Sequence, residues 1–334
     1  PTNHPALNPN VYEADVSAFI VEDKKGNENT IEHLFVNGEL MTIARYPNVD
    51  SPAQKNWLKV GGSAGNDAFT DPQLVAYSKP NNYWKDATLR IRNYSWTYEV
   101  RKVTGYQAAK GKITAKDLGS QLPEWGYFLD GKLEELDHPG EWYYDADAKK
   151  VYVYPRQNDD PNTLLIEGST YGTGISITWH EDNSVVENLT FRHFTAEGAQ
   201  INSSDNVILQ NCHFEHNVTG LSIWNTADIL ITSNTFDHQF KNAIGLSAKT
   251  GFDVKNSVIE KNRITNTAMY PVYGVRYEGV YGGIGISVFG KAYTVRQNTV
   301  ENTGWTGIYL KADGHHLIEN NVVRKSLLDR KSVV

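Results

Sequence analysis

The sequence predicts an all-β fold, a parallel β-helix of about 23 residues per coil that carries an inserted β-rich domain. From about residue 170, an aliphatic residue followed three positions later by Asn recurs, with intervals of 23, 23, 28, 36 and 23 between Asn188, Asn211, Asn234, Asn262, Asn298 and Asn321. Pairs of apolar residues separated by one residue recur in the same phase, and no segment has a helical period. Such a repeat, with Asn and Gly at its corners, is typical of a solenoid whose coils stack about 4.8 Å apart. A leucine-rich repeat is the alternative, but its Leu pattern and helical half are missing.

The paired apolar positions predict which side chains of each coil point inward. They are Ile175/Ile177, Ala199/Ile201, Leu221/Ile223, Ile244/Leu246, Ile284/Ile286 and Ile308/Leu310. Because side chains alternate along a strand, one outward row is expected to be Thr178, Asn202, Trp224, Ser247, Ser287 and Lys311. The neighbouring outward row is expected to be Ser176, Gln200, Ser222, Gly245, Gly285 and Tyr309. The six repeated Asn residues are expected to form an internal ladder, and the recurring His193, His216, His238, Asn266 and Asn302 to be stacking positions rather than metal ligands.

The remaining segments divide by composition and period. Residues 1–48 predict an N-terminal strand layer of the β-helix, and residues 49–168, rich in Trp and Tyr and without the repeat, predict the inserted domain. Residues 169–328 hold the coils. Residues 329–334 have the order that a common sequencing adapter encodes, so we expect a non-native tail and a truncated C-terminus. Asp237 and Glu215 lie beside the His positions and are expected to be exposed.

Composition and charge narrow the class of protein. The chain has 334 residues with 32 Lys and Arg against 39 Asp and Glu, a net charge of -7, which argues against a nucleic-acid partner. No apolar run reaches the roughly 18 residues of a membrane span. The single Cys212 excludes an intramolecular disulfide and a multi-Cys metal site. No motif indicates a cofactor or a metal. Bound Ca²⁺ is compatible with the sequence, but no ligand motif supports it.

Three segments resemble a known group of proteins. They are "LFVNGELMTIARYPN", "YWKDATLRIRNYSW" and "LDHPGEWYYDADAKKVYVYPRQNDDPN", followed by the coils. The chain thereby resembles the bacterial carbohydrate-active right-handed β-helix proteins of the pectate-lyase-like superfamily, closest to β-helix glycoside hydrolases with an inserted β-sandwich, such as β-xylosidases and the fucosidase/xylanase-like family. The resemblance implies a secreted or periplasmic bacterial enzyme that acts on a polysaccharide or oligosaccharide, monomeric when complete. It also implies a catalytic Asp in "TGIYLKADGHHLIEN", where the outward position is Lys311 and Asp313 follows two residues later, and a second carboxylate in a further coil beyond this sequence.

The outward rows and the longer insertion supply the candidate site residues. The rows combine hydroxyl and amide groups with aromatic rings, which suits a sugar groove, so Asn202, Trp224 and Tyr309 are expected to bind substrate, with His315 nearby; an ordinary solvated sheet face is the alternative. The 13-residue insertion "TAMYPVYGVRYEGVYGG" brings Arg276, Tyr277 and Glu278 close in sequence, and insertions in solenoids gather on the binding face. Alternatively, Glu278 pairs with Arg276 in a packed loop.

Two reactions are compatible with these residues. Glu278 and Asp313 are the best carboxylate pair for glycoside hydrolysis, although Asp313 can also be a turn residue before Gly314. Lys311 with Arg276 would suit a polysaccharide lyase, in which a base removes the proton next to a uronate carboxylate. A non-catalytic carbohydrate-binding β-helix module is the third hypothesis.

Overall fold

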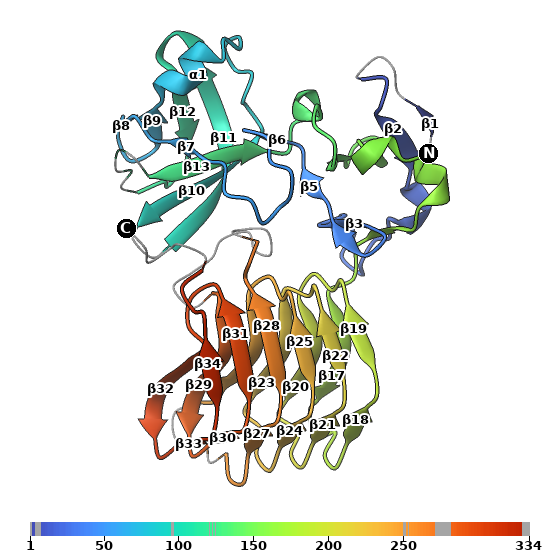
Figure 1. Ribbon diagram of the computed structural model, residues 1–334, viewed down its shortest axis with the longest axis vertical. Helices are drawn as coiled ribbons and strands as arrows, with labels where there is room; N and C mark the ends of the chain where they lie inside the picture. Colours follow the sequence, from blue (N-terminus) through green and yellow to red (C-terminus); the bar gives the residue numbers. More distant parts are fainter. Residues whose placement is uncertain are drawn as a thin grey trace. The chain divides into compact units, whose positions relative to one another are not determined.

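The computed structural model describes residues 2–3, 8–94, 97–119, 121, 123, 125–249, 252, 254–270 and 282–328. Its regular structure is almost entirely β-strand (Figure 1). The chain divides between Thr170 and Tyr171 into two compact units, each with its own buried core. The expected boundaries at 48/49 and 168/169 stay predictions. Within the described residues, no helix combines the length and apolar composition that crossing a bilayer requires.

The first unit contains three sheets. A five-stranded sheet has the order β1-β2-β15-β14-β5, formed by β1 (Thr2–Asn3), β2 (Tyr12–Asp15), β15 (Lys150–Val153), β14 (Glu141–Asp145) and β5 (Thr42–Ile43). A three-stranded sheet joins β16 (Ile166–Gly168), β3 (Leu34–Val36) and β4 (Glu39–Leu40). The third sheet has eight strands: β6 (Arg45–Tyr46), β13 (Gly126–Asp130), β10 (Thr88–Tyr94), β11 (Thr97–Gln107), β12 (Lys112–Ala115), β9 (Ala68–Thr70) and β8 (Gly62–Ser63), with β7 (Leu58–Lys59) paired to β13.

Short helical turns connect these strands. The helix α1 (Pro72–Ala76) begins at Asp71, whose side chain accepts a hydrogen bond from the backbone N–H of Gln73 at 2.8 Å, with Pro72 at the first helical position. The 3₁₀ turns are Ser17–Phe19, Ala108–Lys110, Leu133–Glu135, Arg156–Asn158 and Pro161–Thr163. The core under the eight-stranded sheet includes the fully buried Trp84 and Tyr127.

The second unit is a parallel β-helix, as predicted, with three strands in each of six coils (Figure 1). The first sheet stacks β17 (Thr173–Thr178), β20 (Glu197–Asn202), β23 (Thr219–Trp224), β26 (Asn242–Ser247), β29 (Ile284–Lys291) and β32 (Ile308–Gly314). The second stacks β18 (Val185–Glu187), β21 (Ile208–Gln210), β24 (Leu230–Thr232), β27 (Val258–Glu260), β30 (Thr294–Arg296) and β33 (Leu317–Glu319). The third stacks β19 (Thr190–Arg192), β22 (His213–Glu215), β25 (Thr235–Asp237), β28 (Arg263–Thr267), β31 (Thr299–Thr303) and β34 (Val322–Arg324).

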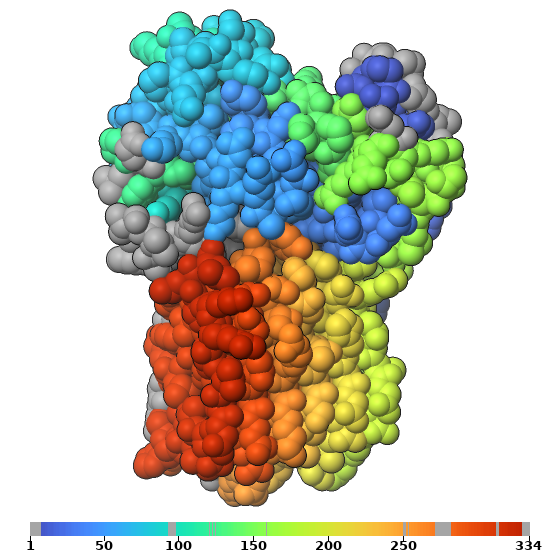
Figure 2. All heavy atoms as spheres, in the orientation of Figure 1, coloured from blue at the N-terminus to red at the C-terminus, as the bar shows by residue number. Residues whose placement is uncertain are grey.

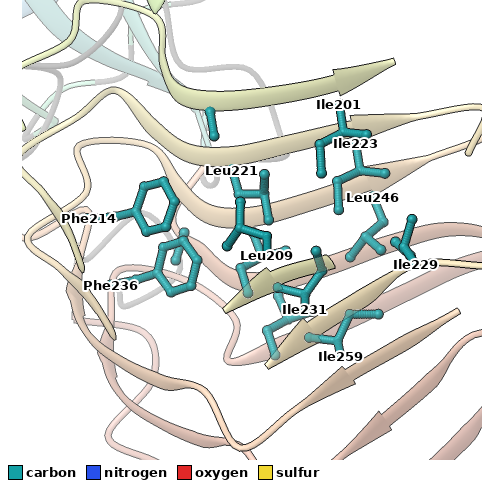
Figure 3. Packing of buried hydrophobic residues seen from close by; sticks show 14 of the residues in the cluster. Ile201, Leu209, Phe214, Leu221, Ile223, Ile229, Ile231, Phe236, Leu246 and Ile259 are labelled. Carbon is teal, nitrogen blue, oxygen red and sulfur yellow. The ribbon is translucent and has the colours of Figure 1, made fainter. Parts of the chain in front are cut away.

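Along the solenoid, equivalent positions of successive coils carry similar residues, which pack against one another. Phe214 and Phe236 stack with ring centroids 4.5 Å apart, and aliphatic columns such as Ile201, Ile223 and Leu246 fill the opposite side of the interior (Figure 3). Each fully buried side chain of this size contributes roughly 1.5–3 kcal/mol. On the surface, the coils follow one another as bands of colour (Figure 2). Repetition of the same apolar positions therefore builds one continuous core.

The Asn ladder is shorter than predicted because one coil has 22 residues. Ile208 pairs with Leu230, so Asn234 lies in register with Cys212 rather than with Asn211. Asn234, Asn262 and Asn298 are buried and hydrogen-bond from coil to coil, and Asn321 continues the ladder. Asn188 and Asn211 instead occupy the preceding turn position, with φ of 59° and 55°, a region that Asn tolerates. The prediction that both belong to the ladder was wrong.

The longer insertion shifts one inward pair. Ile244 pairs with Ile286 and Leu246 with Val288, so the inward residues of β29 are Ile286 and Val288, not Ile284 and Ile286. Gly285 faces inward, because a Cβ there would lie 2.5 Å from Val300 Cγ1. The two outward rows therefore contain Phe289 and Ser287 in this coil, where the sequence analysis expected Ser287 and Gly285. Counting residues between repeats does not give the strand register after an insertion, because the length of the insertion does not show where the next strand begins.

Candidate functional site

The outward face of the first β-helix sheet carries two aligned rows of side chains. The first row is Thr178, Asn202, Trp224, Ser247, Phe289 and Lys311, and the second is Ser176, Gln200, Ser222, Gly245, Ser287 and Tyr309. Asn202 and Trp224, both predicted to bind substrate, are direct neighbours on β20 and β23, and the Trp224 side chain is 39% exposed. An exposed indole beside an amide can stack on a sugar ring and hydrogen-bond its hydroxyls.

The same face holds an aromatic cluster in its last two coils. Tyr309 lies between Trp305 and Phe289, with ring centroids at 5.5 and 5.8 Å. Lys311 Nζ is 5.9 Å from the Phe289 ring centroid, close enough for a cation–π interaction. Tyr309 and Lys311 lie in their predicted rows, whereas Phe289 takes the position predicted for Ser287, because the insertion obscures the register.

Several predicted site residues are not tested by the structure. Arg276, Tyr277 and Glu278 lie outside the described residues. Asp313 belongs to β32, but its side chain is not described. His315 is exposed in the turn after β32, with a φ of 60°. The proposed pairing of Glu278 with Asp313 therefore stays a prediction.

The third sheet brings two carboxylates into register on adjacent coils. Glu215 on β22 pairs with Asp237 on β25, and in-register neighbours lie about 4.8 Å apart along a parallel sheet. The sequence predicts that both residues are exposed, but their side chains are only 34% and 32% exposed. The signal in the sequence was Phe-Glu-His followed 22 residues later by Phe-Asp-His, which places the two acids in one column.

Three neighbouring groups bind the Asp237 carboxylate. Thr265 Oγ1 and Asn266 Nδ2 donate to Oδ1 at 2.6 and 2.8 Å, and His238 Nδ1 lies 2.9 Å from Oδ2. Burial alone would raise the pKa of Asp237, but the hydrogen bonds from His238, Thr265 and Asn266 outweigh it and hold the pKa well below its usual range. Asp237 is therefore an ionised carboxylate at any physiological pH.

Histidines surround the second carboxylate. Glu215 Oε1 lies 3.6 Å from His216 Nδ1, and Glu215 Oε2 lies 3.7 Å from His213 Nε2. His216 and His238 stack at 5.1 Å, and the Tyr270 ring stacks on both at 5.9 and 5.7 Å. The stacking role predicted for the recurring His positions is confirmed. Among the residues that the structure describes, no group of three or more His, Cys, Asp or Glu could hold a metal ion.

The two faces differ in the chemistry that they offer. The first sheet supplies aromatic and neutral polar groups, and the third supplies a carboxylate pair with imidazoles. In retaining glycosidases two carboxyl groups lie about 5–5.5 Å apart, with one ionised and one exchanging a proton. Glu215 and Asp237 lie in register on adjacent strands about 4.8 Å apart, so their side chains leave the sheet as neighbours.

The stacked coils define a parallel β-helix protein, and two family models match parts of the chain, one of them a domain of carbohydrate-active proteins. Residues 161–284 match the family model of the right handed beta helix region, and residues 36–156 match the GH141 insertion domain. A solved structure described as a glycoside hydrolase is 11% identical, with a TM-score of 0.48, over 97% of this chain and 82% of its own. Among curated proteins, none has a sequence that matches this chain significantly.

Proposed function

We propose that the protein is a glycoside hydrolase that cleaves a polysaccharide or oligosaccharide with paired carboxylates on an outward face of its β-helix. The observation that carries the proposal is the match of residues 36–156 to an insertion domain of a glycoside hydrolase family. We further propose that it is a secreted or periplasmic bacterial enzyme that acts as a monomer, as the family resemblance implies.

Glu215 and Asp237 are the carboxylates that the described structure favours for this reaction. Asp237, held ionised by three partners, would act as the nucleophile or stabilise the positive charge that develops on the sugar. Glu215, one-third exposed and flanked by His213 and His216, is placed to exchange a proton with the glycosidic oxygen. Glu278 and Asp313 are the second candidate pair.

Product mass and two carboxylate variants test the proposal. The protein is incubated with plant and algal polysaccharides, and products that carry an added water are expected. Glu215→Gln and Asp237→Asn should each lower kcat by about a thousandfold or more, because each removes a group of the reaction. Glu301→Gln is the matched control: Glu301 lies on the same outward row, paired with Arg324 and Lys325, and its loss should change kcat less than about threefold.

Other outcomes would overturn parts of the proposal. Wild-type rates in both carboxylate variants would refute the assignment and direct mutagenesis to Glu278 and Asp313. Products that lack the added water would refute hydrolysis and favour the lyase alternative. That alternative is motivated by Lys311, which is exposed on the first row, where a glycoside hydrolase would carry a carboxylate.

A further inference from the structure

The first unit contains a cleft of about 440 Å³, outside the β-helix. Its walls come from two sheets: β14 and β5 of the five-stranded sheet, and β10, β11 and β13 of the eight-stranded sheet. This volume is within the range of roughly 300–1,000 Å³ that small-molecule sites occupy. The two walls differ in character, and this difference indicates what the cleft binds.

One wall of the cleft is apolar and aromatic. Ile31, Ile43, Trp142 and Tyr144 line it as part of one hydrophobic cluster, with Tyr144 and Ile43 half-buried. Trp142 is only 2% exposed, and its indole N–H has no hydrogen-bond partner among the described residues. Trp142 is therefore the buried base of this wall, and the more exposed Tyr144 ring offers the surface on which a ligand can stack.

The opposite wall is polar. Arg90 Nε donates to Asp130 Oδ2 at 2.5 Å, and the two residues are only 8% and 1% exposed. Burial raises the pKa of Asp130, and the Arg90 guanidinium acts in the opposite direction. A buried ion pair adds little to the stability of a fold. The position of this pair at the cleft therefore suits a role in ligand recognition. Thr88 and Lys102 extend this wall toward solvent.

The charges around the cleft select against anions. Besides Asp130, the carboxylates of Glu32, Asp145 and Asp147 line it, against two cationic side chains, Arg90 and Lys102. The net negative charge repels uronates and phosphates. A neutral sugar has an apolar face for Tyr144 and hydroxyls for the ion pair, so it matches both walls.

We propose that this cleft is an accessory binding site for a neutral oligosaccharide segment. The site binds a sugar chain and performs no chemistry itself. It does not depend on the reaction proposed for the β-helix, because none of its residues belongs to that unit.

Calorimetric titration of the full chain tests the proposal. Xylohexaose, cellohexaose and an oligogalacturonate are titrated separately, and mass spectrometry afterwards checks that each probe is intact. At least one neutral probe should bind, and the oligogalacturonate should bind at least tenfold more weakly. Tyr144→Ala should weaken binding of the neutral probe about tenfold. Tyr12→Ala is the matched control, because Tyr12 packs on the same hydrophobic cluster without lining the cleft, and it should change the affinity less than twofold.

A second variant is expected to gain affinity, a result that a loss of folding could not produce. Asp147 is exposed at the cleft, and Asp147→Lys should raise the affinity for oligogalacturonate several-fold while leaving the melting temperature unchanged. Three results would overturn the proposal: neither neutral probe binds, folded Tyr144→Ala binds as tightly as the unmodified protein, or Trp224→Ala alone removes all binding. The last would assign the binding to the first β-helix sheet.

Discussion

At the scale of single residues, carboxylates in the same row differ in their hydrogen-bond and ion-pair partners. Asp237 and Glu301 occupy the same outward row of the third sheet, yet Asp237 accepts hydrogen bonds from Thr265 and Asn266 while Glu301 pairs with Arg324 and Lys325. Both have a lowered pKa, with hydrogen bonding as the cause in each. His238, Thr265 and Asn266 hold the Asp237 carboxylate in place and keep it ionised, whereas Glu301 is paired with two permanent cations.

Asp237→Asn should reduce stability in a pH-dependent way. The folded-state pKa of Asp237 lies below the value of about 3.9 for an unfolded chain. The stabilisation is therefore fully present above about pH 4 and is lost as the pH falls toward the folded-state pKa. We expect the variant to lose about 1–2 kcal/mol at pH 7 and the difference to shrink below pH 4, measured by urea unfolding at several pH values.

The matched comparison for this measurement is Glu187→Gln. Glu187 is an exposed carboxylate on the second sheet that accepts one hydrogen bond from Gln210, so its replacement should change the unfolding free energy by less than about 0.5 kcal/mol. A loss in Asp237→Asn that persists undiminished at pH 3 would contradict the role given to its charge.

At the scale of elements, two columns of small or polar residues fix how the coils stack. One is the Asn ladder, in which each side-chain Nδ2 donates to the Oδ1 of the next coil, and each Oδ1 accepts from the backbone N–H and the Nδ2 of the preceding coil. The other lies inside the first sheet, where Gly198, Gly220, Gly285 and Gly307 let the backbone approach the aromatic and aliphatic core. Both columns are consequences of close backbone spacing in a parallel solenoid.

Asn262→Ala should destabilise the β-helix by about 1–3 kcal/mol, because it leaves the buried backbone N–H of Asn234 without its acceptor. Asn211→Gly is the control. Asn211 is exposed, and Gly adopts its positive φ without strain, so stability should change by less than about 0.5 kcal/mol. Chemical denaturation measures both, and equal losses would contradict the corrected register.

Gly220→Ala should destabilise the β-helix by about 1–3 kcal/mol through overpacking. A Cβ at this position would lie 2.6 Å from both the Ala243 carbonyl oxygen and Phe236 Cδ1. Gly172→Ala has nothing within 4 Å of the added carbon and should leave the melting temperature unchanged. Thermal unfolding of the two variants compares them, and a silent Gly220→Ala would refute the steric account.

At the scale of the whole molecule, the chain builds two separate hydrophobic cores. The core of the eight-stranded sheet centres on Trp84 and Tyr127, and the β-helix core centres on stacked rings such as Phe214 and Phe236. The first unit combines antiparallel sheets with loops, while the second repeats one coil. Each core is large enough to unfold as a cooperative unit of its own.

Calorimetry should therefore resolve two unfolding transitions. Trp84→Ala and Phe236→Ala each remove a fully buried aromatic side chain, at a cost of about 3–5 kcal/mol. Each variant should lower the midpoint of one transition and leave the other in place. A single transition that both variants shift equally would show that the units unfold together.

The sequence by itself determined the all-β class, the parallel solenoid and which residues occupy most of the outward positions. These features follow from alternation and repetition, which are local properties of a strand and are visible in the order of residues. That is why Asn202, Trp224, Tyr309 and Lys311 were placed correctly on the first sheet.

Only the tertiary structure decided the register across the insertions and the partners of buried polar groups. Phe289 replaced Ser287 in its row, and Asn211 left the ladder, because hydrogen bonds between coils fix register and a residue count does not. The setting of Asp237 and the cleft around Trp142 likewise depend on side chains far apart in sequence, from residues 30 to 147 in the cleft. Only folding places such side chains beside one another, and their pKa values and unmet hydrogen bonds follow from that placement.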